Sequence, residues 1–165
     1  MTTSFAFDSP AAALGALLGR VAPVVTERVA LDDAGGRVLA EDVCADRASP
    51  ACDVSAMDGY AVRIADLAGG SLAVSGEIAI GSAPPAMPEG AALQIVTGAP
   101  VPDGAEAVIK REDVEETPGR IGVGVDVAAS VKPGQNIRRM GENLEGGALV
   151  CHGGRGPRSR FRDRS

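Results

Sequence analysis

An acid and a hydroxyl, each placed just before a glycine, are the residues of this chain best suited to hold a metal-bound phosphate. Asp58 precedes Gly59 in the segment SAMDGYAV (55–62), so the backbone can turn sharply and let the carboxylate project. A projecting carboxylate can hold Mg²⁺, directly or through water, next to a phosphate. It can equally satisfy its own loop as an Asx-turn, and the residue alone leaves both interpretations open.

The hydroxyl belongs to Thr97, which a β-like run delivers to a turn at Gly98. The hydroxyl and the neighbouring backbone N–H groups could face a ligand oxygen there. A plain strand-to-loop turn is the alternative, and the spacing of a Walker A phosphate loop is absent. The charged residues 110–113, which follow this loop, are more typical of a solvent-exposed strand end.

A third charged segment, GQNIRRMGENLEGG (134–147), adds Arg138 and Arg139 beside a turn that contains Glu142 and Asn143. In an acidic chain, paired arginines are candidates for contacts with phosphate or carboxylate groups. An ordinary surface ion pair explains them equally well.

Histidine and cysteine chemistry receives little support. His152 is the only histidine, which excludes a Ser-His-Asp or Cys-His arrangement and a histidine-based metal site. Cys44, Cys52 and Cys151 form no CxxC pair, which fits incidental thiols in a reducing cytoplasm better than a disulfide framework.

The elements that must position these residues are mostly short strands. With 22 glycines and 11 prolines in 165 residues, the composition favours many strands and turns over a helical bundle. Ser9 and Pro10 suit the start of one amphipathic helix. The predicted elements are a helix over 8–20, strands over 24–31, 42–45, 71–80, 92–98, 107–116 and 120–129, a short helix or turn over 32–42, an irregular loop over 47–62, and a turn-rich segment over 132–150. We therefore predict a mainly β or α+β chain with coiled and barrel-like sheets and a short N-terminal helix.

Charge separates the C-terminal segment from the rest of the chain. Residues 151–165 carry five arginines and one aspartate, although the whole chain has a net charge of −6. The acidic body should repel nucleic acid and anionic membranes, and neither a membrane-spanning stretch nor a signal peptide is indicated. We predict that 151–165 is disordered. It is either a basic arm for an anionic partner or, as its abrupt onset favours, an out-of-frame ending.

Four ordered motifs resemble the molybdopterin molybdenumtransferase family, known as MoeA in bacteria and as the matching domain of gephyrin. They cover about 110 residues: GRVLAEDV (36–43), SAMDGYAV (55–62), LQIVTGAPVPDGAEAVIKRED (93–113) and NIRRMGEN (136–143). The resemblance implies Mg²⁺-dependent insertion of molybdate into adenylylated molybdopterin with release of AMP. It also implies a cytoplasmic homodimer that works with a molybdopterin adenylyltransferase.

The resemblance further implies two domains. An elongated, discontinuous dimerisation domain would comprise 1–45 and 131–150, and an inserted β-rich domain would comprise 46–130. In the family the inserted domain of one subunit faces the catalytic domain of the other across the active-site cleft. That catalytic domain lies beyond this sequence, so the resemblance predicts that this chain alone is inactive.

By this resemblance, Asp58 and Thr97 are the catalytic candidates, and Asp58 is also the metal candidate. The cofactor-binding candidates are Ser55, Gly59, Gly98, Arg138 and Glu142. Asn143 departs from the family, which usually has an acidic residue there, and an amide cannot supply the same charge to a metal. Two alternatives remain open at this stage: a non-catalytic dimerisation or ligand-binding module, and an unrelated β-rich structural domain.

Overall fold

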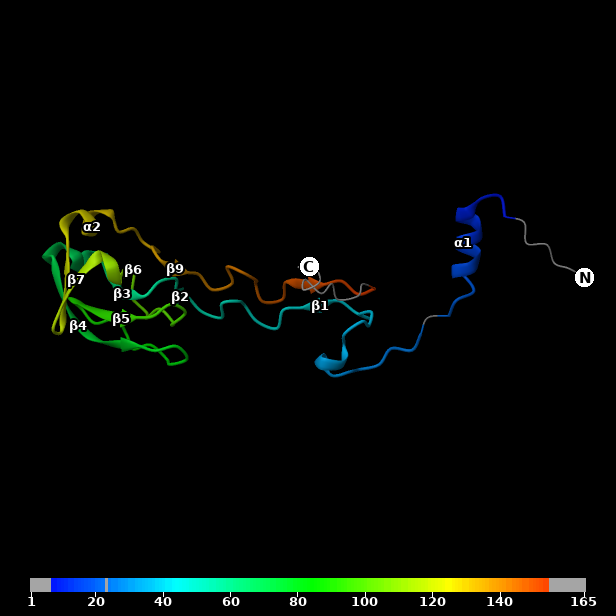
Figure 1. The fold of residues 1–165 in the computed structure, drawn as a ribbon, viewed down its shortest axis with the longest axis horizontal. Helices are drawn as coiled ribbons and strands as arrows, with labels where there is room; N and C mark the ends of the chain where they lie inside the picture. Colours follow the sequence, from blue (N-terminus) through cyan, green and yellow to red (C-terminus); the bar gives the residue numbers. More distant parts are fainter. Residues whose placement is uncertain (1–6, 23, 155–165) are drawn as a thin grey trace, which may run out of the picture. The chain divides into compact units, whose positions relative to one another are not determined.

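The computed structural model describes residues 7–22 and 24–154 and divides the chain into two compact units. The first unit comprises Met1–Glu41 with Gly153–Ser165, and the second comprises Asp42–His152. The second unit contains every predicted site residue, and it is drawn from cyan to orange in Figure 1.

The described part of the first unit contains two short helices. Helix α1 spans Pro10–Leu18, and the Ser9 side chain caps it by accepting a hydrogen bond from the Ala12 backbone N–H at 3.2 Å. This confirms the predicted helix and its cap. The 3₁₀-helix η1 spans Leu31–Asp33.

The strand predicted over 24–31 was wrong. Residues 24–30 form no strand, and Leu31 begins η1. The alternating pattern alone did not suffice, because a strand needs a neighbour to pair with. Among the described residues none pairs with this segment.

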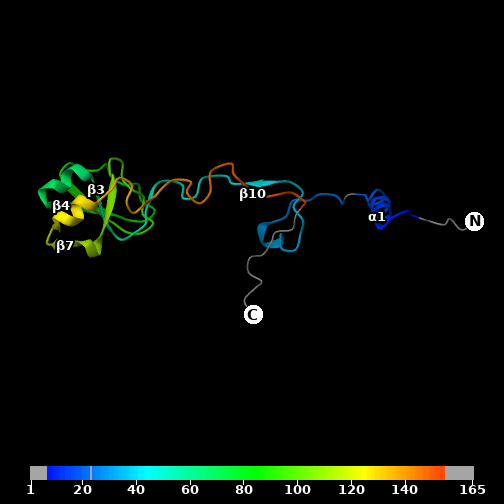
Figure 2. The same ribbon diagram turned by 90° about the horizontal axis from the view of Figure 1, so that it is seen from above.

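A narrow two-stranded ribbon forms one end of the second unit (Figure 2). Strand β1 (Val43–Cys44) pairs with β10 (Leu149–Cys151), and β2 (Val54–Ser55) pairs with β9 (Ile137–Arg138). Both pairs are antiparallel, so two segments far apart in sequence run side by side. Because β10 includes Cys151, regular structure continues past the predicted start of the tail; residues 155–165 lie outside the described residues.

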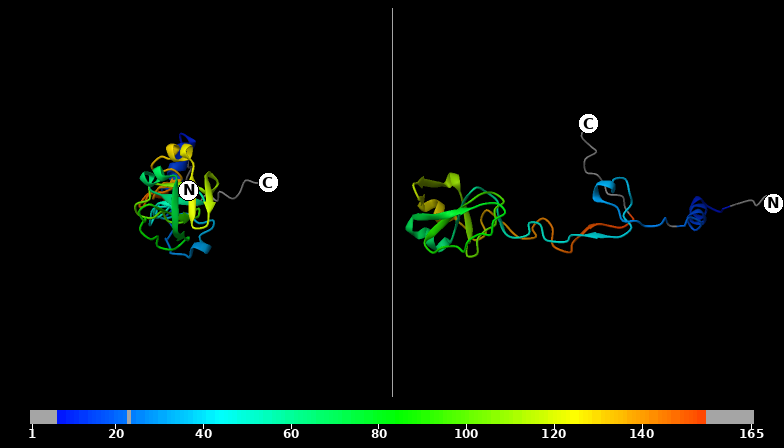
Figure 3. Two further views of the ribbon diagram at one scale, coloured as in Figure 1. Left: turned by 90° about the vertical axis from the view of Figure 1, so that its left-hand side faces the viewer. Right: turned by 90° about the horizontal axis from the view of Figure 1, so that it is seen from below.

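A curled six-stranded sheet forms the other end of this unit (Figure 3). Its strands, in the spatial order β6-β3-β5-β4-β8-β7, are Ala107–Lys110, Gly59–Val62, Ala91–Ile95, Ser71–Ile78, Arg120–Val123 and Val114–Thr117. Only β4 and β5 are parallel, and the other neighbours are antiparallel. The mainly β fold with a barrel-like sheet is thereby confirmed.

Both faces of the central strands are buried. In β3, Tyr60 and Val62 belong to one hydrophobic cluster and Ala61 to the other, as expected for side chains that alternate along a strand. The first cluster is covered by the 3₁₀-helix η2 (Ile64–Gly69), which contributes Leu67, and by helix α2 (Val125–Ser130). Aliphatic residues supply almost all of this core, and Tyr60 is its one aromatic member among the described residues.

Three predicted boundaries changed for identifiable reasons. The supposed loop 47–62 contains β2 and β3, because a strand buried on both faces shows no alternating pattern. The strand predicted over 107–116 is interrupted by the 3₁₀-helix η3 (Arg111–Asp113). The strand predicted over 120–129 ends at Val123, where Gly124 caps α2.

None of the helices in residues 7–22 and 24–154 has the length and apolar character needed to cross a membrane.

Candidate functional site

Asp58 and Thr97 lie together because their strands are neighbours. Asp58 directly precedes β3, and Thr97 follows β5 by two residues. These strands are antiparallel with Gly59 opposite Ile95, so the start of one meets the end of the other. The Thr97 backbone N–H and its hydroxyl both donate to Oδ1 of Asp58, each at 2.7 Å.

The loop before Asp58 is shaped by Ser55. Its hydroxyl donates to the Met57 carbonyl at 2.6 Å and accepts from the Met57 N–H at 3.3 Å. The Ser55 carbonyl accepts from the Gly98 N–H at 2.8 Å. This bond links the first bend, at Asp58-Gly59, to the second bend, at Thr97-Gly98. Gly98 has a φ of 83°, a conformation that favours glycine. Because Ser55 is only 1% exposed, it fixes the loop and its side chain is not open to a ligand.

Gly59 is required by a close approach of two strands. A Cβ atom at this position would lie 1.9 Å from the Ile109 carbonyl oxygen of the paired strand β6. Gly59 therefore sets the position of Asp58 through its lack of a side chain. Its predicted role in contacting a cofactor stays a prediction.

A hollow of about 670 Å³ opens over this pair of residues. Its lining residues come from the loops around Asp58 and Thr97, the end of β6, η3 and β7: Met57, Asp58, Thr97, Lys110, Arg111, Glu112, Val114 and Glu116. The Arg111 N–H donates to the Asp58 carbonyl at 3.1 Å, which brings η3 against the first bend. Lys110, Arg111 and Glu112 thus line the hollow, and the side chains of Arg111 and Glu112 also remain largely exposed, as predicted for 110–113.

Arg111, Glu116 and Tyr60 form a connected polar group in which Arg111 and Glu116 line the hollow. Arg111 donates from Nε and an Nη atom to the two carboxylate oxygens of Glu116, at 2.6 and 2.9 Å. The Tyr60 hydroxyl donates to the same carboxylate at 2.9 Å. These contacts hold the pKa of Glu116 below its usual range, Arg111 having the larger effect. Burial and the adjacent carboxylate raise the pKa of Tyr60.

Sequence reasoning missed Glu116 and Tyr60. Glu116 falls in β7 beside Glu115, a pair that is typical of an exposed edge strand, and Tyr60 was not singled out. Tyr60 is 4% exposed, but its hydroxyl reaches Glu116. The signal available was that a buried tyrosine hydroxyl normally requires a polar partner.

Asp58 is held in its ionised form. The Thr97 backbone N–H is the main cause that lowers the pKa of Asp58, followed by the Thr97 hydroxyl and, more weakly, by the charge of Arg111. Both hydrogen bonds from Thr97 go to Oδ1 of Asp58. Oδ2 makes no hydrogen bond to the described residues.

Removal of the Thr97 hydroxyl is expected to raise the pKa of Asp58 without restoring it fully. In Thr97→Val the backbone N–H still donates, so the pKa should remain below the ordinary value of about 3.9. The stabilisation linked to this lowered pKa is present above the unfolded-state pKa and is lost as the pH falls through the folded-state value. A carboxyl-detected NMR titration of both proteins measures the shift, and an Asp58 pKa unchanged by the substitution would contradict this assignment.

The third motif does not reach the hollow. Arg138 donates to the Glu142 carboxylate at 3.4 Å and to the Asn143 side-chain oxygen at 2.5 Å. Glu142 also accepts from the Arg139 N–H at 3.1 Å, so the turn is closed by its own side chains. The structure therefore favours the ion-pair interpretation, and it does not bring Arg138 and Glu142 together with Asp58.

A fully protein-ligated metal site is absent from residues 7–22 and 24–154, which contain no cluster of three acidic, histidine or cysteine ligands. Mg²⁺ does not require one. It is commonly held by one or two carboxylates together with waters and substrate phosphates. Asp58, which lines the hollow and is bound by Thr97 through Oδ1 alone, fits that mode of binding.

The fold and this site define a β-rich domain with an open, charged hollow, and comparison with known proteins gives the family. A sequence model described as the MoeA N-terminal region (domain I and II) matches residues 9–157. The molybdopterin molybdenumtransferase of Synechococcus elongatus is 41% identical over 158 residues, which is 89% of this chain and 38% of that protein. The enzyme of the same name from Haemophilus influenzae is 40% identical over 134 residues, covering 80% of this chain and 32% of that protein.

A solved structure agrees with these sequence matches. The molybdopterin biosynthesis moeA protein of Pyrococcus horikoshii OT3 superimposes with a TM-score of 0.68 and 37% identity, covering 78% of this chain and 35% of that one. The chain belongs to the MoeA N-terminal region family. It spans less than two fifths of the length of the curated relatives that it matches.

Proposed function

We propose that this chain supplies one wall of the active site of a molybdopterin molybdenumtransferase. In that reaction molybdate is inserted into adenylylated molybdopterin, and AMP is released. The observation that carries the proposal is the pairing of Asp58 with Thr97 at the floor of an open, charged hollow. The family relatives, whose names specify this transferase, support it.

Asp58 would face the magnesium ion, and Thr97 would orient that carboxylate. The bound ion would supply positive charge that neutralises the phosphate groups of the substrate. Thr97 uses its hydroxyl hydrogen on Asp58, so its oxygen lone pairs remain able to accept a hydrogen bond from the ligand. Ser55, Gly59 and Gly98 keep the two bends in register and so fix the distance between the two side chains.

The rest of the pocket would come from elsewhere in the assembly. The hollow is open to solvent, so a second surface would be needed to exclude water from the reaction. We expect that surface to be a catalytic domain in a homodimer, with residues 46–130 as the inserted domain and residues 1–45 with 131–150 as the dimerisation domain. Leu14, Leu17 and Leu18 of α1 are each more than half exposed, which fits a helix that packs against a partner.

The substrate is expected to come from a molybdopterin adenylyltransferase acting before this step, and the protein is expected to act in the cytoplasm. This chain alone should not release AMP, because one wall holds the phosphates but does not enclose the pterin.

A chimera tests the proposal. Residues 9–157 of this chain would replace the matching N-terminal region of the Synechococcus elongatus relative, and AMP release would be measured with molybdate and adenylylated molybdopterin. We expect turnover within about tenfold of the parent, because ordered motifs for both bends are present. A folded, dimeric chimera that turns over no faster than the parent lacking this region would contradict the proposal.

A further inference from the structure

Arg111 lines the same hollow as Asp58, and its backbone is fixed to that residue. The Arg111 N–H donates to the Asp58 carbonyl, and the charge of Arg111 acts on the Asp58 carboxylate. The arginine side chain is 62% exposed and lines the hollow. It is therefore accessible to a ligand that already contacts Asp58.

The orientation of the guanidinium group is set by Glu116. Two of its five N–H donors, one on Nε and one on an Nη atom, are directed at the carboxylate oxygens of Glu116. Tyr60 in turn donates to the same carboxylate from the buried core. The remaining three donors meet no acceptor among the described residues, and a planar guanidinium clamped along one edge presents the other edge in a fixed geometry suited to phosphate.

The charges of the hollow disfavour a bare anion. Asp58, Glu112 and Glu116 contribute three negative charges, whereas Lys110 and Arg111 contribute two positive charges. Lys110 lies 3.6 Å from Glu112, which partly neutralises it. A free phosphate would meet a lining with one excess negative charge, whereas a phosphate that carries a divalent cation would meet a carboxylate for its metal and a guanidinium for its oxygen.

We infer that Arg111 binds a phosphate oxygen of the ligand while Asp58 faces the magnesium ion carried by that phosphate. The hollow is thus a site for a metal-complexed phosphate or pyrophosphate group. This inference rests on the proposed function, since it names the part of the substrate that this wall contacts. Arg111 becomes the residue that selects the phosphate end of the ligand.

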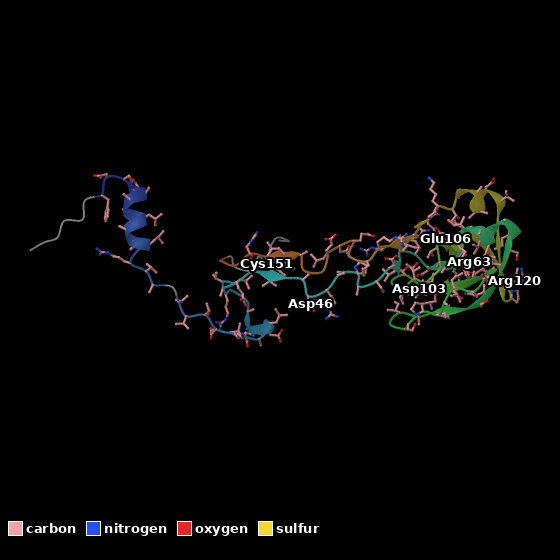
Figure 4. All side chains as sticks on the ribbon, turned by 180° about the vertical axis from the view of Figure 1, so that it is seen from behind. Asp46, Arg63, Asp103, Glu106, Arg120 and Cys151 are labelled. Atoms are coloured by element: carbon pink, nitrogen blue, oxygen red, sulfur yellow. The ribbon has the colours of Figure 1, made fainter. Side chains whose placement is uncertain are left out.

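Inorganic pyrophosphate with Mg²⁺ is a suitable probe, measured by calorimetric titration of the 165-residue chain. We expect binding that weakens at least tenfold in Arg111→Met, because one charge-assisted contact is lost. The affinity of Arg111→Lys should lie between those of the unsubstituted chain and Arg111→Met, because lysine keeps the charge but lacks the planar edge. Arg120→Met is the matched control and should bind as the unsubstituted chain does, because Arg120 lies on β8 and contacts Ser71 (Figure 4).

Omission of Mg²⁺ is expected to weaken pyrophosphate binding at least tenfold in the unsubstituted chain, because the lining carries an excess negative charge. Thermal unfolding of each variant checks that the fold is intact. Equal affinity in Arg111→Met, equal affinity without Mg²⁺, or no detectable binding at millimolar pyrophosphate would each overturn the inference. Those results would leave the chimera's AMP release unaffected, so the proposed function would be judged separately.

Discussion

Asp58→Asn in the chimera is expected to reduce AMP release by about two orders of magnitude. The amide keeps the size of the side chain but removes the negative charge that a magnesium ion requires. Loss of a group that holds or orients a metal typically costs ten- to a hundredfold, and Asp58 is expected to do both. Because the carboxylate is surface-exposed and its main partner is the Thr97 N–H, the amide oxygen can still accept that bond and the fold should persist.

The matched control for this substitution is Asp103→Asn. Asp103 is exposed in the loop 99–106 and does not line the hollow, and Figure 4 labels its position. Its AMP release should equal that of the unsubstituted chimera. If excess Mg²⁺ restored no AMP release in the Asp58→Asn chimera, the substitution would not act through weakened metal affinity. If both variants turned over equally, Asp58 would have no role in the reaction.

The largest effect on stability is expected from Gly59→Ala. The added methyl would lie 1.9 Å from the Ile109 carbonyl oxygen, and neither atom belongs to a flexible side chain. The strand pair β3–β6 would have to separate, which breaks the hydrogen bonds that hold β6 at the edge of the sheet. We expect a loss of about 3 kcal/mol in the free energy of unfolding, measured by urea denaturation.

Two other glycines act as controls for Gly59→Ala. Gly98 has open space around it but a positive φ, so Gly98→Ala should cost only about 1 kcal/mol. Gly124 has open space and a φ of −60°, so Gly124→Ala should be nearly neutral. A Gly59→Ala protein as stable as the Gly124→Ala protein would show that the two strands lie farther apart than the structure places them.

The sequence predicted the two bends well because their chemistry is local. An aspartate before a glycine, and a threonine before another glycine at the end of a buried strand, each indicate a sharp turn with a projecting polar group. Their meeting depends on the antiparallel pairing of β3 with β5, which was not predicted because 47–62 was expected to form a loop. The helical cap at Ser9 is similarly local, and it was also predicted.

The features that were missed depend on contacts between distant residues. Arg111 and Glu116 line the hollow because η3 interrupts what looked like one strand, and no pattern within 107–116 indicates that break. Ser55 was expected to contact a ligand, but the packing of the Gly98 bend over it removes it from the surface. For the segment 24–30 the alternating pattern was present, but no strand in the described part of the chain pairs with it.

The most direct test of the central claim is the site of metal binding on this chain. Mn²⁺ can replace Mg²⁺ and broadens the NMR signals of nearby nuclei, so a backbone amide spectrum recorded with pyrophosphate and substoichiometric Mn²⁺ locates the ion. We predict that the amides of Asp58, Thr97 and Arg111 broaden first. Preferential broadening at an acidic segment elsewhere, with the Asp58 and Thr97 amides unaffected, would contradict the account.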